Sequence, residues 1–154
     1  MRCLGIDYGE KRIGLAYGDE VGVAYPLPAA VEHTVEARLA HIEETINTRK
    51  VDTLVVGYPY YMDGAISPKA REVDAFIEIL ESRFGLPVHR TDERLTSVAA
   101  EALGKKKRFK SVRQRRRERQ SGQTDSRAAA LFLQDWLDQI ILPEMSEFAE
   151  DESI

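Results

Sequence analysis

The chain has one cysteine in 154 residues, so no disulfide can form within it. Cys3 lies in an apolar run, where we interpret it as a core side chain of a protein of the reducing cytosol. The three histidines have no spacing that predicts a zinc site. No apolar run has membrane-spanning length, and Asp7 and Glu10 interrupt the only apolar stretch near the start. We therefore expect a cytoplasmic protein without a signal peptide or membrane span.

Positive charge is scarce outside one segment. The chain carries a net charge of −4, yet residues 105–120 alone carry +9, which leaves −13 on the rest. Local charge governs phosphate binding, so the acidic pI of about 5.5 does not argue against a nucleic-acid partner.

The first part of the chain predicts a meander followed by alternating helices and strands. Residues 2–8, 12–17 and 21–28 read as three short antiparallel strands. A helix begins after Thr34, which we expect to be its N-cap, and residues 51–57 form a buried strand. A second helix opens at Ser67-Pro68 and ends at Gly85, and residues 86–91 form a fifth strand.

The last third predicts two helices around the basic segment. A short helix is expected over residues 96–103, and a longer one from Thr124 to just before Pro143. The longer helix should bury these apolar side chains: Ala128, Ala129, Phe132, Trp136, Leu137 and Ile140. We expect one domain over residues 1–142 with a mobile basic loop at 105–122, and a loosely held acidic tail at 143–154.

This order of elements predicts an α/β fold with a mixed five-stranded sheet. Three antiparallel strands come first, and right-handed helical crossovers then place two parallel strands beside the first. The first strand becomes central, and the carboxyl ends of the parallel strands open on one edge, where ligands gather in such sheets.

Three acidic residues fall where an element meets that edge: Asp7, Glu93 and Asp125. Clustered carboxylates repel each other, so their joint ionisation needs a cation. Oxygen ligands without histidine or cysteine favour Mg²⁺ or Mn²⁺. Two such ions, ~3.5–4 Å apart, would suit the in-line displacement of a phosphodiester.

Each carboxylate also has a purely structural interpretation. Asp7 could hydrogen-bond the amides of the turn that follows it. Asp125 could favour the helix N-terminus through the helix dipole, and for this residue alone that interpretation is the stronger one. Glu93 could pair with Arg94, and Asp92 is an equally acidic neighbour.

Basic residues near the same edge are candidate nucleic-acid contacts. The basic segment is either a mobile loop or a helix ordered by phosphate, and a solvated linker is the alternative. The tyrosines at 58, 60 and 61 could stack on unpaired bases or pack on the domain itself. The candidate contacts are Lys11, Arg12, Arg94, Lys105, Lys106, Lys107, Arg108, Lys110, Arg113, Arg115, Arg116 and Arg117.

Four segments resemble the motifs of the YqgF family of bacterial proteins: GIDYGEKRIGLA, VGYPYYMDG, TDERLTS and TDSRAAALFLQDWL. The resemblance covers about residues 1–142. It implies a ribonuclease H-like fold and divalent-metal nuclease activity, with Asp7, Glu93 and Asp125 at the acidic positions of the family. The chain departs from the family pattern in the density of its basic segment and in Arg127.

We therefore expect a metal-dependent endonuclease acting on structured nucleic acid, first on precursor 16S ribosomal RNA at its 5′ end. One alternative is a Holliday junction resolvase, which would need a dimer to make two symmetric cuts, and the sequence allows a monomer or a homodimer. Another is a non-catalytic RNA-binding factor of ribosome assembly. A phosphotransferase sharing the same core fold has low weight, because such enzymes use two of these domains.

Overall fold

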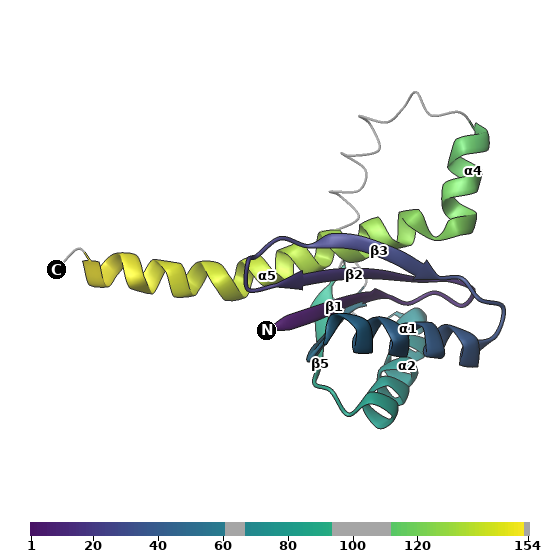
Figure 1. Ribbon diagram of the computed structural model, residues 1–154, viewed down its shortest axis with the longest axis horizontal. Helices are drawn as coiled ribbons and strands as arrows, with labels where there is room; N and C mark the ends of the chain where they lie inside the picture. Colours follow the sequence, from purple (N-terminus) through teal and green to yellow (C-terminus); the bar gives the residue numbers. More distant parts are fainter. Residues whose placement is uncertain (61–66, 94–111, 153–154) are drawn as a thin grey trace.

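The computed structural model describes residues 1–60, 67–93 and 112–152 of the chain. Figure 1 shows its strands and helices. The strands are β1 (Arg2–Asp7), β2 (Ile13–Asp19), β3 (Tyr25–Ala30), β4 (Thr53–Tyr58) and β5 (Val88–Asp92). The helices are α1 (Val35–Arg49), α2 (Pro68–Phe84), α4 (Val112–Ser121) and α5 (Gln123–Glu152).

The five strands form one mixed sheet in the order β3-β2-β1-β4-β5, which confirms the predicted fold class. β1, β2 and β3 are antiparallel neighbours, whereas β4 and β5 run parallel to β1. Ile6 pairs with Val56, and Tyr58 pairs with Asp92. The three parallel strands therefore end at the same edge, and this edge positions the site described below.

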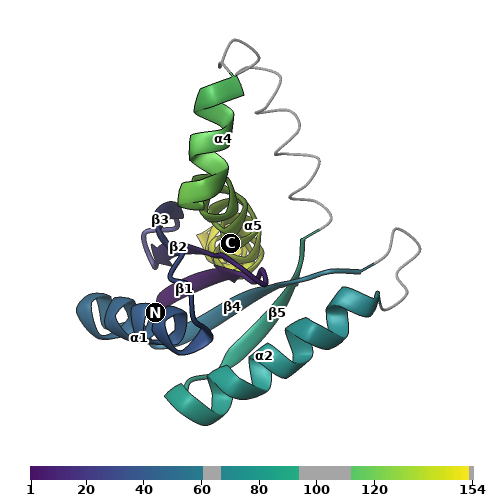
Figure 2. The ribbon, with the colours of Figure 1, turned by 90° about the vertical axis from the view of Figure 1, so that its right-hand side faces the viewer.

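Helices cover both faces of the sheet. α1 and α2 lie on one face, and α5 crosses the other face and extends beyond the sheet (Figures 1 and 2). Alternate residues of β1 serve the two layers, because successive side chains of a strand point to opposite faces. Leu4 and Ile6 pack with α1 and α2, whereas Cys3 packs with Phe132 and Leu133 of α5. Burial raises the pKa of the Cys3 thiol to about 11, so it is an inert core side chain.

The predicted ends of α1 and α2 are confirmed. The Thr34 hydroxyl accepts the N–H of Ala37, and the Ser67 hydroxyl accepts the N–H of Ala70. Gly85 closes α2 in the left-handed region, at φ 65°. Such caps satisfy backbone groups that a helix end leaves unpaired.

The predicted end of the last helix is wrong, because α5 continues through Pro143 to Glu152. Proline removes one hydrogen bond and costs about 3 kcal/mol in a helix interior. The glutamates, Met145 and Ala149 that follow favour helix, and α5 continues through Pro143 without interruption. Of the side chains expected in the core, three are buried and Leu133 joins them, while Ala128, Trp136 and Ile140 are half-buried.

Other predicted bounds also differ from the structure: β2 spans Ile13–Asp19 rather than residues 12–17, and β4 and β5 each begin two residues later than predicted. β3 begins at Tyr25 rather than at residue 21, because a turn occupies residues 19–22. The Asp19 carboxylate accepts the N–H of Val21, and Gly22 has a φ of 91°. In the basic segment, residues 112–121 form α4, whereas residues 96–103 and 105–111 lie outside the described residues. Among the described residues, no helix has the length and apolar character needed to cross a bilayer.

Candidate active site

Asp7 is the last residue of the central strand β1 and is partly buried. Burial raises the pKa of its carboxyl to about 7, and the negative charges of Glu93 and Asp125 add to this effect. The ammonium of Lys69 acts in the opposite direction. Asp7 therefore lies within electrostatic reach of both acidic residues that the sequence singled out, although they are far from it along the chain.

Asp125 reaches the site because the start of α5 is seated directly on β2. Gly14 pairs with Asp7 across the first hairpin, and a Cβ atom on Gly14 would lie 2.2 Å from the carbonyl of Asp125. Only glycine permits such a close approach. The buried hydroxyl of Ser126 also accepts the N–H of Leu15 at 3.1 Å. The first turn of α5 is thus fixed above the Asp7–Gly14 pair.

The side chain of Asp125 forms an ion pair with Arg12, whose Nε atom lies 3.4 Å from a carboxylate oxygen. Burial raises the pKa of Asp125, and the charge of Arg12 opposes the rise. Arg12 was predicted to contact nucleic acid, and in the structure it is also a partner of the acidic cluster.

Glu93 directly follows β5 and lies over the end of β4. A Cβ atom on Gly57 would come within 3.1 Å of the Glu93 Oε2 atom, which places this carboxylate above the sheet edge. Burial raises the pKa of Glu93, Lys69 opposes the rise, and Asp92 adds to it. Among the charges that raise the pKa of Asp7, Glu93 has the largest effect and Asp125 follows, so Glu93 is a direct electrostatic partner of Asp7.

The charges of the three carboxylates interact, but the carboxylates do not form a preformed metal site. Among the described residues, no group of three histidine, cysteine, aspartate or glutamate side chains stands close enough to hold a metal ion as it is. Like charges without a cation between them repel, and Asp7 relieves part of that repulsion by holding a proton up to about pH 7.

Lys69 is a residue that the sequence reasoning missed. It lies in the first turn of α2, and its charge lowers the pKa of each of the three carboxyl groups. It also lines a cavity of about 370 Å³ together with Lys11, Arg12 and Asp125. The position of Lys69 directly after Ser67-Pro68, in the helix that follows β4, was the available signal, because β4 ends at this edge.

Arg38 is a second residue that the sequence did not single out. This buried arginine of α1 donates to the carbonyl of Glu32 at 2.7 Å and to that of Glu10 at 3.1 Å. Glu10 lies in the turn between β1 and β2 that carries Lys11 and Arg12. Arg38 therefore fixes the turn through the carbonyl of Glu10. No sequence pattern indicates which group a buried arginine contacts.

The predicted nucleic-acid contacts fall into three groups. Lys11 and Arg12 line the cavity beside the carboxylates. Arg113, Arg116 and Arg117 are exposed on α4, and the backbone of Arg115 belongs to the same helix. The remaining predicted contacts lie outside the described residues: Arg94, Lys105, Lys106, Lys107, Arg108 and Lys110.

Tyr58, at the end of β4, and Tyr60 pack against other residues of the domain. The ring of Tyr58 is buried, and its hydroxyl donates to Asp74 at 2.8 Å. Tyr60 packs against it with ring centroids 4.9 Å apart. Of the two interpretations, packing on the domain therefore describes Tyr58 and Tyr60, while Tyr61 lies outside the described residues.

The acidic cluster predicts that the metal-free protein loses stability as the pH rises. Unfolded Asp7 titrates near 3.8 and folded Asp7 near 7, so the folded state binds the proton more tightly between these values. The free energy of unfolding should fall over this range. An Asp7→Asn variant lacks this loss, so its stability relative to wild type should rise by about 3 kcal/mol between pH 5 and pH 8.

Urea denaturation in EDTA at the two pH values measures this difference. Glu78→Gln, on the exposed face of α2, is the matched control and should follow the wild type. A constant difference between wild type and Asp7→Asn across the pH range would contradict the raised pKa of Asp7, which burial causes first and the charges of Glu93 and Asp125 increase.

Comparison with known proteins agrees with this fold. Residues 1–139 match the model of the RuvX family, which is described as "Holliday junction resolvase". A protein of Opitutus terrae named "Putative pre-16S rRNA nuclease" is 52% identical over 151 residues, covering 97% of this chain and all of that protein. A protein of Anaeromyxobacter with the same name is 44% identical and covers 90% of this chain and 97% of its own.

Comparison with solved structures finds a similar fold in RuvC. The RuvC structure of Thermus thermophilus matches with a TM-score of 0.51 and 16% identity, over 92% of this chain and 96% of that one. RuvC in complex with a Holliday junction substrate matches with a TM-score of 0.52. RuvC has a ribonuclease H-like fold, so the fold expected from the sequence is confirmed. The motif resemblance is confirmed as well: the chain belongs to the RuvX (YqgF) family of nucleases.

Proposed function

We propose that this chain is a divalent-metal-dependent endonuclease of structured nucleic acid, with precursor 16S ribosomal RNA as its substrate and the cytoplasm as its place of action. The observation that carries the proposal is the shared electrostatic environment of Asp7, Glu93 and Asp125 at the carboxyl edge of the sheet. The names of the curated relatives support the choice of substrate.

The residues at this edge fit a divalent cation. The cluster offers only carboxylate oxygens, which are the ligands that Mg²⁺ and Mn²⁺ prefer. Its carboxylates repel one another, and Asp7 holds a proton to about pH 7 in the absence of a cation. Asp7, Glu93 and Asp125 would hold the metal, which would activate water and stabilise the leaving oxygen of the phosphodiester.

The chain's own residues orient the substrate around that site. Lys11, Arg12 and Lys69 line the cavity together with the carboxylates of Glu10, Glu72 and Asp125, and these three cations are the groups that would contact an entering phosphate. The exposed arginines of α4 extend the positive surface away from the cavity, and such contacts position a nucleic acid without reading its sequence. Arg38 keeps the cationic turn in place through the carbonyl of Glu10.

Junction resolution is the second candidate, favoured by the description of the family model and by the fold shared with RuvC. It requires two active sites that face opposite strands, and therefore two copies of the chain. A non-catalytic RNA-binding role is the third candidate. The electrostatic coupling of three carboxylates around Asp7 weighs against it, because a binding module gains nothing from that repulsion.

Incubation of the wild-type chain with both candidate substrates distinguishes these functions. A 16S precursor with its 5′ extension and a four-way DNA junction are each end-labelled and incubated with Mn²⁺, with Mg²⁺ or with EDTA. We expect site-specific cleavage of the RNA with either metal and none in EDTA. Paired symmetric cuts in the junction beside intact RNA would favour the resolvase, and intact substrates under all conditions would favour the binding role.

A further inference from the structure

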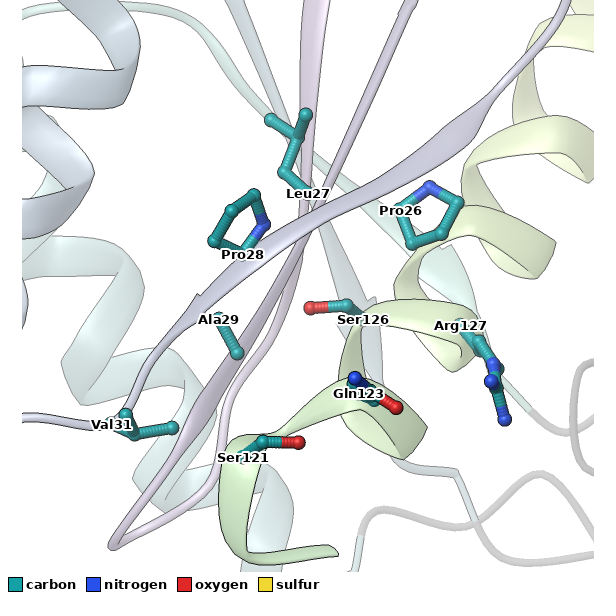
Figure 3. Close-up of a pocket in the computed structure, with 9 residues that line it drawn as sticks. All are labelled: Pro26, Leu27, Pro28, Ala29, Val31, Ser121, Gln123, Ser126 and Arg127. Carbon is teal, nitrogen blue, oxygen red and sulfur yellow. The ribbon is translucent and has the colours of Figure 1, made fainter. Parts of the chain in front are cut away.

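A second cavity lies on the other side of the α5 N-terminus from the carboxylates. It has a volume of about 610 Å³ and lies between edge strand β3 and the corner where α4 meets α5. Figure 3 shows the residues of β3 along one side and Ser121, Gln123 and Arg127 on the corner opposite. We call this cavity the β3 groove.

The walls of the β3 groove are fixed by close contacts. Gly122, at the corner, has a φ of 77°, and a Cβ atom there would lie 2.5 Å from the Cβ of Ala29. Ser126 lines the groove and is held by the N–H of Leu15. The helix corner is therefore seated on β3 and β2, and the groove is preformed rather than opened by its occupant.

The groove adjoins the proposed active site. Asp125 lines the cavity of the carboxylates, and the next residue, Ser126, lines the β3 groove. The first turn of α5 thus lies between the two cavities, and a helix with its side chains is about 10–12 Å wide. A strand in duplex geometry rises about 3.4 Å per nucleotide and an unpaired strand is more extended, so roughly three nucleotides or fewer span this distance.

The residues that line the β3 groove indicate what kind of ligand it binds. Pro26, Pro28 and Val31 supply apolar surface for the flat face of a base. The carboxamide of Gln123 can both donate to and accept from a base edge, and Arg127 supplies positive charge for a phosphate. The exposed arginines of α4 continue this charge. An apolar surface for a base face, a carboxamide for its edge and cations for its phosphates together suit an unpaired nucleotide.

Strand addition by another protein does not fit this edge. β3 is the outer strand of the sheet, and a peptide would have to pair with its free backbone groups. Pro26 and Pro28 have no N–H, so the strand lacks donors at two alternate positions. Proline on an edge strand is a common obstacle to such pairing.

We propose that the β3 groove binds an unpaired nucleobase of the substrate strand, a few nucleotides from the phosphate held at the carboxylates. This inference rests on the proposed function for its substrate class. It adds a contact that reads a base, whereas the cations around Asp7 contact only the phosphates.

A comparison of two single strands tests the groove without requiring cleavage. The probes are an oligouridine of about twelve nucleotides and an abasic ribose-phosphate oligomer of the same length, and binding is measured in EDTA by fluorescence anisotropy. Wild type should bind oligouridine about tenfold more tightly, because one base face buries apolar area on the groove wall and its edge pairs with Gln123. Val31→Glu should lose most of this preference, because it places a carboxylate on the groove wall.

Val21→Glu is the matched control, since Val21 is exposed in the turn before β3 and does not line the groove. It should keep the wild-type preference, and Gln123→Ala should reduce it with the fold intact by circular dichroism. The inference is overturned if Val31→Glu and Val21→Glu behave alike. It is also overturned if Val31→Glu only converts a dimer to a monomer in sedimentation velocity. Because no cleavage is measured, a chain that fails to cut either substrate can still pass this test.

Discussion

Asp7→Asn is expected to lower the rate of cleavage by about a thousandfold or more, while the affinity for nucleic acid changes by less than about threefold. Asp7 is the group on which both other carboxylates act, so it is the central ligand of the proposed metal site. Asparagine keeps the shape of the side chain and removes its charge. A loss of this size corresponds to about 4 kcal/mol of transition-state stabilisation, within the contribution expected from a catalytic metal ion.

Single-turnover cleavage with saturating Mn²⁺ measures the rate, and anisotropy in EDTA measures the affinity. Glu72→Gln is the matched control, because Glu72 is an exposed carboxylate that lines the same cavity and lies outside the proposed metal site. It should retain most of the cleavage rate. If Asp7→Asn cleaved as fast as Glu72→Gln, the acidic cluster would not be the catalytic centre.

The Asp7→Asn variant should keep its affinity for nucleic acid, because the residues proposed to bind phosphate are not those proposed to hold the metal. The cations that line the cavity are Lys11, Arg12 and Lys69, and the ion-pair partner of Arg12 is Asp125 rather than Asp7. Above pH 7, where Asp7 is ionised in the absence of metal, loss of its negative charge would even strengthen the attraction for phosphate slightly. A parallel fall in rate and affinity would instead indicate that Asp7 supports the fold.

The sequence predicts the sheet and its acidic edge because both follow from local patterns. The β-branched run that became β4 and the capped helices on either side of it require parallel crossovers, and these place Asp7 at the centre. Thr34, Ser67 and Gly85 act as caps where their types predict it. Such features depend on a few neighbouring residues, so a single chain reveals them.

Contacts between distant segments leave no such local pattern. Asp125 and Gly14 are in contact although they are more than a hundred positions apart in the sequence. A glycine in a strand does not indicate which backbone segment packs against it. The charge of Lys69 matters only because α2 begins at the edge where β1 and β5 end. Continuation of α5 beyond Pro143 depends on the balance between one lost hydrogen bond and the favourable residues that follow.

Gly14→Ala is expected to destabilise the protein by about 2–4 kcal/mol and to slow cleavage about a hundredfold. The new Cβ would lie 2.2 Å from the carbonyl carbon and oxygen of Asp125 and 2.7 Å from the nitrogen of Ser126. These are backbone atoms, so no flexible side chain can turn away, and the first turn of α5 must move. Overpacking of this kind costs about 1–3 kcal/mol. Loss of the buried Ser126–Leu15 hydrogen bond adds to it.

The same displacement accounts for the expected loss of activity, because a shift of about 1 Å in a catalytic group can lower a rate about a hundredfold. Urea denaturation and single-turnover cleavage measure the two effects. Gly85→Ala is the control: it strains a residue at φ 65° with no atom within 4 Å, so it should cost about 1–2 kcal/mol and leave the cleavage rate unchanged. Equal cleavage rates of Gly14→Ala and Gly85→Ala would mean that the position of the Asp125 carboxylate does not depend on the packing of α5 against β2.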